Sequence, residues 1–527
     1  MSFVTQAKTK RLLAVHGWSG TILGLLLYVV IFTGAIVVFA DEIGAWSRGA
    51  LGAESGLGPQ VDHRFRVAAR TVDRNYYEDV SIGRTRTGDF SYTFEGHEID
   101  PSTGEEVDAL VRLRVDPESG EVLERWEGLE SDLPRDSTNA LSRFWVDLHE
   151  ELYLPAPYGF FLVCVLGMMM MFAAVSGVLI HKHVVRDAFV AARNPTRLVG
   201  ARDLHVLAGT WGIPFAILLA LTGAFLGFAF SVGVPVMAMI AFEGDQQAMI
   251  ETLVARPEAG VDLTPAPLAA LDFVIRDAME RTGATVSSIQ ISNFDSVGAT
   301  ISVIMGPAPG GFSGQRLEFD GVTRAFEGVQ PGFGTAHSLS STLFGIIRPL
   351  HFGDFAGLGS KTVWFGMGLA MAYVNATGML LWCKRREDQA LWRSFRHWIM
   401  VTIFGLPFAM LVSAVAYFVT VPVADAHFWT PVGFLVGLFL CIALGLKSEN
   451  AGNKLRLANA VLCLALPVLR HLMGGTSWSE SLISGGAEIL VIDILLLAMG
   501  LLLLRKARAR SIDTEPPSLG TVREPAE

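Results

Sequence analysis

The stretch "RLLAVHGWSGTILGLLLYVVIFTGAIVVFADE" (residues 11–42) decides the fold. From Leu12 to Ala40 it carries no Asp, Glu, Lys or Arg, and ~20 apolar residues are enough to cross the hydrocarbon core of a bilayer. The run is too long for the apolar part of a signal peptide, so we predict a retained membrane helix. His16 stands near its start, and ionisable side chains in membrane segments are costly and commonly functional.

The composition agrees with a membrane protein. Of 527 residues, 51% are hydrophobic and 17% are charged, whereas soluble domains have about 25% charged residues. The net charge of −10 and the absence of a basic arm argue against nucleic-acid binding. The four cysteines form no CxxC pair, so neither a disulfide framework nor a zinc site is expected.

Seven further segments have the composition of membrane spans. They cover residues 152–180, 206–242, 362–383, 398–424, 428–446, 457–469 and 489–504. The segment 457–469 is short, and it spans only if the flanking Arg456 and Arg470 snorkel. Asp493 lies inside the last segment, where we expect a snorkelling or paired residue rather than a proton site.

Lysines and arginines flank the spans on one side. They precede the first span, join the second to the third, and follow the fourth and the eighth. The positive-inside rule therefore predicts a multi-pass membrane protein with both termini cytoplasmic and two long polar segments outside. Turns such as "VDPESGEVL" (115–123) between alternating strands predict a small α+β module in each polar segment.

The chain also aligns with itself. His16 matches His205, and Leu148-His149 matches Leu350-His351. Two further matches are dipeptides in which a glycine follows Ser or Thr: Thr33-Gly34 matches Thr222-Gly223, and Ser176-Gly177 matches Thr377-Gly378. A unit of helix, outer module and helix therefore occurs twice in parallel orientation.

We accordingly predict an α-helical integral membrane protein with a four-helix core from two parallel repeats, plus about four C-terminal transmembrane helices. The predicted parts are an N-terminal segment with the first helix (1–40), the first outer module (41–157), the second helix (158–183), a cytoplasmic link (184–203), the third helix (204–232), the second outer module (233–361), the fourth helix (362–386), helices five to eight (387–505), and a disordered cytoplasmic tail (506–527).

The repeat gives the histidines their meaning. Equivalent positions lie at equal membrane depth, so we pair His16 with His205 at the cytoplasmic side and His149 with His351 at the outer side. Two facing imidazoles between helices suit a six-coordinate b-type haem. Zinc or iron held by protein alone usually needs three or four ligands. We therefore predict two haem b groups.

Three further residues are candidates for the same sites. His183 is a possible additional haem ligand or an interfacial cation. His337 could line the outer haem or a substrate site. Arg348 suits an anionic ferric chelate, because guanidinium binds carboxylate-like oxygens in a bidentate manner, but a lipid-headgroup contact is an equal alternative.

Several motifs together resemble the PepSY-associated transmembrane family, which includes membrane reductases of iron–siderophore uptake. They are "HGWSGTILGLLLYVVIFTG" (16–34), "VDPESGEVL", "LHEELYL" (148–154), "RDLHVLAGTWG" (202–212) and "PLHFGDFAG" (349–357). The resemblance covers about residues 10–386. It implies four core helices, outer PepSY modules and haem held by histidines, at positions that match His16, His149, His205 and His351 here, with His183 and His337 as possible extras.

We therefore expect a protein of the bacterial inner membrane that transfers electrons through two haems to an outer acceptor. The favoured substrate is ferric iron in a siderophore, so the activity would be that of a ferric-siderophore reductase. No GxGxxG loop follows a strand, so a quinol or a separate cytoplasmic reductase must donate the electrons. Two alternatives stay open. One is a PepSY binding or peptidase-regulating protein without haem, and the other is a transporter for iron or siderophore.

Overall fold

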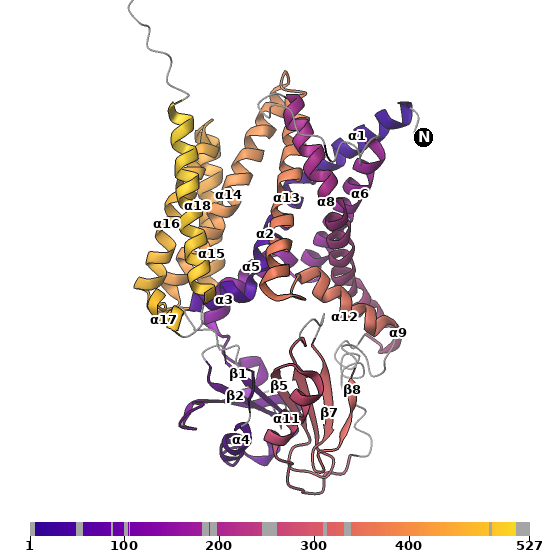
Figure 1. The fold of residues 1–527 in the computed structure, drawn as a ribbon, viewed down its shortest axis with the longest axis vertical. Helices are drawn as coiled ribbons and strands as arrows, with labels where there is room; N and C mark the ends of the chain where they lie inside the picture. Colours follow the sequence, from indigo (N-terminus) through magenta and orange to yellow (C-terminus); the bar gives the residue numbers. More distant parts are fainter. Residues whose placement is uncertain are drawn as a thin grey trace, which may run out of the picture.

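The computed structural model describes most of the chain. Outside the described residues lie 1–5, 49–55, 59, 86–87, 100–103, 105, 182–188, 190–197, 245–260, 309–313, 331–338, 484–486 and 513–527. The candidates His183 and His337 fall within these ranges. The chain is mostly helical, and an antiparallel sheet lies at one end of the long helices (Figure 1).

The first apolar run is divided where we expected one helix. It forms α1 (Gln6–Ile22) and α2 (Gly24–Val37), which are bent by 68° at Leu23. Gly20 and Gly24 flank the bend, and glycine weakens a helix interior by roughly 0.5–1 kcal/mol. Gly24 also faces the Met379 side chain, which a Cβ would approach to 2.5 Å. The bend thus places α2 closely against a neighbouring helix.

Among the described residues, six helices are long and apolar enough to cross a membrane, and the bent pair makes a seventh if it is one span. They are α6 (Tyr158–Ile180), α8 (Leu198–Phe228, which continues through the π-helical turn Ala229–Gly233 into α9, Val234–Ala241), α13 (Gly357–Lys384), α14 (Ala390–Thr420), α15 (Ala426–Lys447) and α16 (Ala451–Leu472). The chain is therefore a multi-pass helical membrane protein.

The last helix, α18 (Ala487–Ile512), packs along α16 and continues beyond the predicted end at residue 505. Asp493 on α18 is fully buried and accepts from Arg470 Nη2 at 2.8 Å, Trp46 Nε1 at 2.7 Å and Trp478 Nε1 at 2.9 Å. Arg470 therefore does not snorkel as predicted, because a buried carboxylate pairs with it inside the bundle.

The same correction applies to Arg456 at the other end of the short segment. Its side chain is buried, and its guanidinium carbon lies 4.5 Å from the centre of the Phe404 ring. α16 is longer than the apolar segment that predicted it, so both arginines are part of the helix, with Arg470 in its last turn.

The two outer segments form one sheet rather than two separate modules. The first supplies β1 (Asp79–Arg84), β2 (Phe90–Ile99), β3 (Glu106–Val115) and β4 (Val122–Leu129), and the second supplies β5 (Val286–Ser292), β6 (Thr300–Met305), β7 (Arg316–Asp320) and β8 (Phe326–Gln330). The order is β4-β3-β2-β1-β5-β6-β7-β8. β1 and β5 pair antiparallel from Asp79↔Ser292 to Ile82↔Ile289 and so join the segments.

Each segment also contributes a helix to the sheet core. These are α4 (Val61–Ala69) and α11 (Leu271–Thr282), whose apolar residues pack with the alternating buried side chains of the strands. The two helices cap one another. Asp272 Oδ1 accepts from the backbone N–H of Val61 at 3.0 Å, while Asp62 Oδ1 accepts from that of Leu271 at 2.9 Å. Carboxylates at helix N-termini satisfy otherwise unpaired N–H groups, so this exchange ties the segments together.

Several short helices lie between the long helices and the strands along the chain, and one more joins α16 to α18. They are α3 (Ala40–Arg48), η1 (Arg74–Tyr76), η2 (Glu130–Asp132), η3 (Ser137–Asn139), α5 (Ala140–Glu150), α12 (Leu339–Phe352) and α17 (Trp478–Ile483). α5 and α12 lie at the sheet end of the long helices, whereas α1 begins at the opposite end (Figure 1). α14, α15, α16 and α18 form a bundle beside the other helices.

Candidate functional site

The structure brings His149 and His351 together. His149 lies near the end of α5 and His351 near the end of α12, and their ring centres are 6.4 Å apart with 21° between the ring planes. A metal ion at ~2 Å from one nitrogen of each of two opposed rings separates the ring centres by roughly 6 Å. The observed spacing therefore fits two imidazoles on opposite sides of one metal ion.

The hydrogen bonds of these two rings use Nδ1. His149 Nδ1–H donates to the Val30 carbonyl at 3.0 Å, and His351 Nδ1 lies 2.9 Å from the Thr222 hydroxyl oxygen. The Thr222 hydroxyl already donates to the Leu218 carbonyl at 2.8 Å, so its oxygen accepts from the imidazole. With the proton on Nδ1, the lone pair of each ring is on Nε2, which is the state of a histidine ready to bind a metal.

The second pair repeats this chemistry at the other end of the helices. His16 Nδ1 lies 2.9 Å from Ser176 Oγ, and His205 Nδ1 lies 3.2 Å from Thr377 Oγ1. Ser176 and Thr377 donate their protons to carbonyls of their own helices, and so both oxygens accept from the imidazoles. His16 and His205 lie close enough to interact electrostatically.

A glycine faces each of the four rings from a neighbouring helix. A Cβ would lie 2.6 Å from His149 Cε1 at Gly34, 2.8 Å from His351 at Gly223, 3.1 Å from His205 at Gly378 and 3.6 Å from His16 at Gly177. Each glycine follows a Ser or Thr, namely Thr33, Thr222, Thr377 and Ser176. Each imidazole is thus seated against a Ser/Thr–Gly pair, which we call its seat.

Burial keeps the outer pair neutral. It lowers the pKa of His149 to about 4 against the opposing hydrogen bond to Val30. It lowers the pKa of His351 to about 3, with the adjacent His149 as a second cause. Neutral imidazoles carry the free lone pair that metal ligation requires.

The donor set distinguishes a macrocycle-bound metal from a bare one. Among the described residues, no three or more His, Cys, Asp and Glu side chains converge as a metal site. The four cysteines are buried and unpaired, and they are distributed over different helices. Two imidazoles are too few for a structural zinc or iron ion, but they suffice where a porphyrin supplies the other four ligands.

The remaining predicted residues do not join the pairs. His183 and His337 are outside the described part of the chain. Arg348 lies on α12, is exposed, and stacks its guanidinium carbon 5.2 Å from the centre of the Phe352 ring. Arg348 precedes His351 by one helical turn, but its ring contact is with Phe352 of its own helix and not with either histidine ring.

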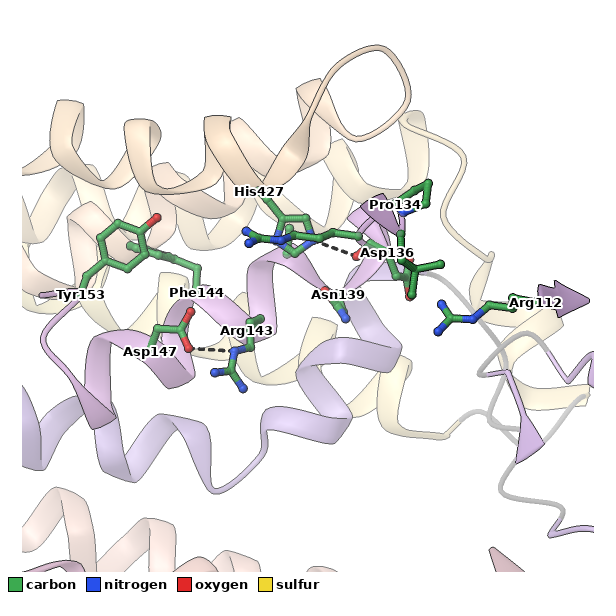
Figure 2. Close-up of a pocket in the computed structure, with 12 residues that line it drawn as sticks. Arg112, Pro134, Asp136, Asn139, Arg143, Phe144, Asp147, Tyr153 and His427 are labelled. Carbon is green, nitrogen blue, oxygen red and sulfur yellow. Dashed lines mark hydrogen bonds and ion pairs between the residues drawn. The ribbon is translucent and has the colours of Figure 1, made fainter. Parts of the chain in front are cut away.

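A pocket lies on α5 that no sequence motif predicted. It has a volume of about 580 Å³ and is lined by Arg112, Leu133, Pro134, Arg135, Asp136, Asn139, Ala140, Arg143, Phe144, Asp147, Tyr153 and His427 (Figure 2). Arg143 and Asp147 are four residues apart on α5 and form an ion pair of 2.8 Å. The only local signal was the basic residues of "LPRDSTNALSR" (133–143), which come together with Arg112 and His427 only in the folded chain.

These features define a multi-pass helical membrane protein with an antiparallel sheet at one end and two histidine pairs seated on Ser/Thr–Gly pairs. The model of the PepSY-associated TM region family matches residues 13–385, and the chain belongs to that family. It is also similar to the Uncharacterized protein PA4219 of Pseudomonas aeruginosa, with 26% identity over 257 residues. That match covers 46% of this chain and 63% of the relative's length.

Proposed function

We propose that the protein is a di-haem b electron-transfer protein of the bacterial inner membrane that reduces an acceptor at its sheet end. The observation that carries this proposal is the fourfold seat. Four histidines on four helical segments each donate Nδ1–H to a hydroxyl or carbonyl oxygen and face a glycine of a neighbouring helix, so that each presents Nε2. A structural histidine has no need for this arrangement to recur four times.

The chain's own residues would hold and tune the two haems. His149 and His351 would hold one haem, and His16 and His205 the other. The acceptors on Nδ1 fix the plane of each ring and raise its basicity, which stabilises the oxidised metal. Bound haem supplies one-electron chemistry, and the protein supplies placement and potential.

An internal duplication accounts for this arrangement. We define the first half as residues 6–181 and the second half as residues 198–384. Each half contributes a helix with four antiparallel strands to the sheet, and each contributes one histidine to each pair. The halves meet at the antiparallel β1–β5 pair, which supports a two-fold relation between them.

Charge and chemistry suggest the direction of electron flow. Lysines and arginines flank the helix ends opposite the sheet, so that side would be cytoplasmic and the sheet periplasmic. The favoured acceptor is ferric iron in a siderophore, because reduction to the ferrous state weakens binding by hard oxygen ligands. A quinol or a separate cytoplasmic reductase would donate electrons to the His16–His205 end.

One feature that a transporter could use is already engaged. The buried Asp493 carboxylate accepts from Arg470 and two indoles. Breaking such a pair leaves an uncompensated buried charge, so the network is better suited to holding helices together.

Purified full-length protein tests the proposal. We expect b-type bands in the reduced-minus-oxidised spectrum and two haems per chain by pyridine haemochrome. His149→Ala or His351→Ala should remove one haem, His16→Ala or His205→Ala the other, and His63→Ala, at an exposed site on α4, neither. A folded but colourless protein after expression with ample haem would reject the proposal and favour a PepSY binding protein.

Reoxidation tests the acceptor separately. Chemically reduced protein should be reoxidised by added ferric siderophore, with ferrous iron trapped by a chelator. Reduced protein that is inert to ferric chelates but reacts with a soluble cytochrome would exclude the iron substrate while leaving the two haems in place.

A further inference from the structure

The pocket on α5 has the charge of an anion-binding site. Its lining brings together three arginines, Arg112 on β3, Arg135 before η3 and Arg143 on α5. Two carboxylates, Asp136 and Asp147, lie in the same lining. The guanidinium groups therefore outnumber the carboxylates even with His427 neutral.

The two carboxylates already have partners. Asp136 Oδ1 accepts from the backbone N–H of Thr138 at 2.9 Å and from its hydroxyl at 2.6 Å, which caps η3. Asp147 pairs with Arg143, as Figure 2 shows. Within the described part of the chain, no carboxylate lies within ion-pair distance of Arg112 or Arg135. Arg112 interacts with Glu95 only at longer range than an ion pair, so neither guanidinium group is held in an ion pair and both can meet an anion from outside.

The pocket lies beside the outer histidine pair but does not include it. Arg143 and Asp147 are one helical turn apart and so share a face of α5. His149 follows Asp147 by two residues, which is roughly 200° around a helix with 3.6 residues per turn. One face of α5 thus lines the pocket while the opposite face carries the ring of His149.

The C-terminal helices complete this pocket. His427 lies at the start of α15 and its Nε2 is bonded to the Asp136 carbonyl at 3.0 Å, which holds the 133–139 segment against that helix. α15 also packs against α5. Helices beyond the family match at residue 385 therefore shape a surface next to the outer pair.

We propose that this pocket binds a small soluble anion with two or more carboxylate groups, which is the anionic part of the electron acceptor. A volume of about 580 Å³ is in the range of small-molecule sites, and guanidinium groups bind carboxylates in a bidentate manner. A soluble ligand is favoured because Arg112 belongs to a strand of the sheet, which lies away from the long helices. Only the link to an electron acceptor rests on the proposed function.

Calorimetric titration with citrate tests the pocket in the full-length haem-loaded protein in detergent. Citrate should bind, and acetate should bind far more weakly because it offers one carboxylate. Each lost guanidinium should weaken citrate binding by roughly 10-fold. The variants are Arg135→Gln, which changes an exposed side chain, and the double variant Arg112→Gln/Arg135→Gln. Arg276→Gln, on α11 and outside the pocket, is the matched control.

The outcomes separate the pocket from the proposed function. Unchanged citrate affinity in Arg135→Gln and in the double variant overturns the pocket, even if both haems are present. Displacement of citrate by phosphatidylglycerol in mixed micelles assigns the pocket to lipid and also overturns the proposal. Arginine-dependent citrate binding by a protein without haem upholds the pocket and rejects the electron-transfer function.

Discussion

The two halves of the chain hold their outer histidines with different atoms. In the second half, the Thr222 side chain accepts from His351, whereas in the first half the Val30 main-chain carbonyl accepts from His149. Thr33 and its equivalent Thr222 both donate to carbonyls of their own helices, but only the Thr222 oxygen also accepts from a histidine ring. The position of the ring and the protonation of Nδ1 are the same in both halves. The geometry of the seat, rather than one acceptor atom, is what the halves share.

The halves also differ in their first helices. The first half bends by 68° between α1 and α2, while α8 in the second half is one helix from Leu198 to Phe228. His16 and Gly34 consequently lie on separate helices, but His205 and Gly223 lie on one. In both halves, these helices nevertheless carry a histidine ring at one end (His16 or His205) and the seat of an outer histidine at the other (Gly34 or Gly223).

The glycines of the outer seats should produce the largest effect. Gly34→Ala introduces a Cβ at 2.6 Å from a ring carbon of His149, and Gly223→Ala introduces one at 2.8 Å from a ring carbon of His351. Overpacking of this kind costs ~1–3 kcal/mol, and at contacts this short we expect the upper end, so one haem should be retained roughly 100-fold less tightly in either variant. Pyridine haemochrome and the low-spin ferric signal in electron paramagnetic resonance measure the loss.

The matched control is Gly177→Ala at the seat of His16, where the new Cβ would meet the ring at an ordinary 3.6 Å. It should keep both haems. A strong loss in only one of the two outer variants would show that the halves do not contribute equally. Full retention in both would mean that the rings do not occupy these seats.

Removing the hydroxyls should separate the two halves. Thr222→Val deletes the acceptor for His351, and we expect about 10-fold weaker haem retention, the lower end of the ~10–100-fold range for loss of such a partner. Thr33→Val leaves the Val30 carbonyl in place and should change haem retention much less. Transfer of haem to apomyoglobin measures retention. Thr222→Ser should restore it, and equal effects at both positions would contradict the assignment of acceptors.

Local patterns predicted the elements better than their partners. Alternating residues indicated the strands, but nothing local could show that β1 pairs with β5, because Val80 and Ile291 are far apart in sequence. The apolar run likewise did not reveal the bend at Leu23, because Gly20 and Gly24 are two of its four glycines and nothing local singles them out. The prediction that Arg456 and Arg470 snorkel failed because their partners, Phe404 and Asp493, lie on other helices and cannot be identified from the local sequence.

The same limit applies to the candidate site. Self-alignment matched the histidines and the Ser/Thr–Gly pairs as separate features, but not the contact between Gly34 and His149. That contact depends on how α5 packs against α2, and the spacing of residues along the chain does not determine this packing. The pocket was missed for a related reason, since Arg112 and His427 are brought together by tertiary packing.

The smallest expected effect is a pH dependence confined to the first half of the sheet. His97 on β2 contacts Glu78 through Nε2 at 3.0 Å and Asp108 through Nδ1 at 3.1 Å. Partial burial opposes the charge of this imidazole, but the two carboxylates outweigh it and raise the pKa of His97. Strands β5–β8 contain no histidine, so the second half has no counterpart.

A raised pKa in the folded state means that this contribution to stability is complete below the unfolded value of about 6.5 and is lost as the pH rises through the folded value. Because the His97 side chain is 43% exposed, the effect should not exceed ~1 kcal/mol. Hydrogen exchange of β2 and β3, corrected for the intrinsic pH dependence of exchange, should show the strands opening more readily toward alkaline pH. His97→Gln should remove this dependence and His63→Gln should keep it. An equal dependence in β5–β8 would contradict a local origin in the first half.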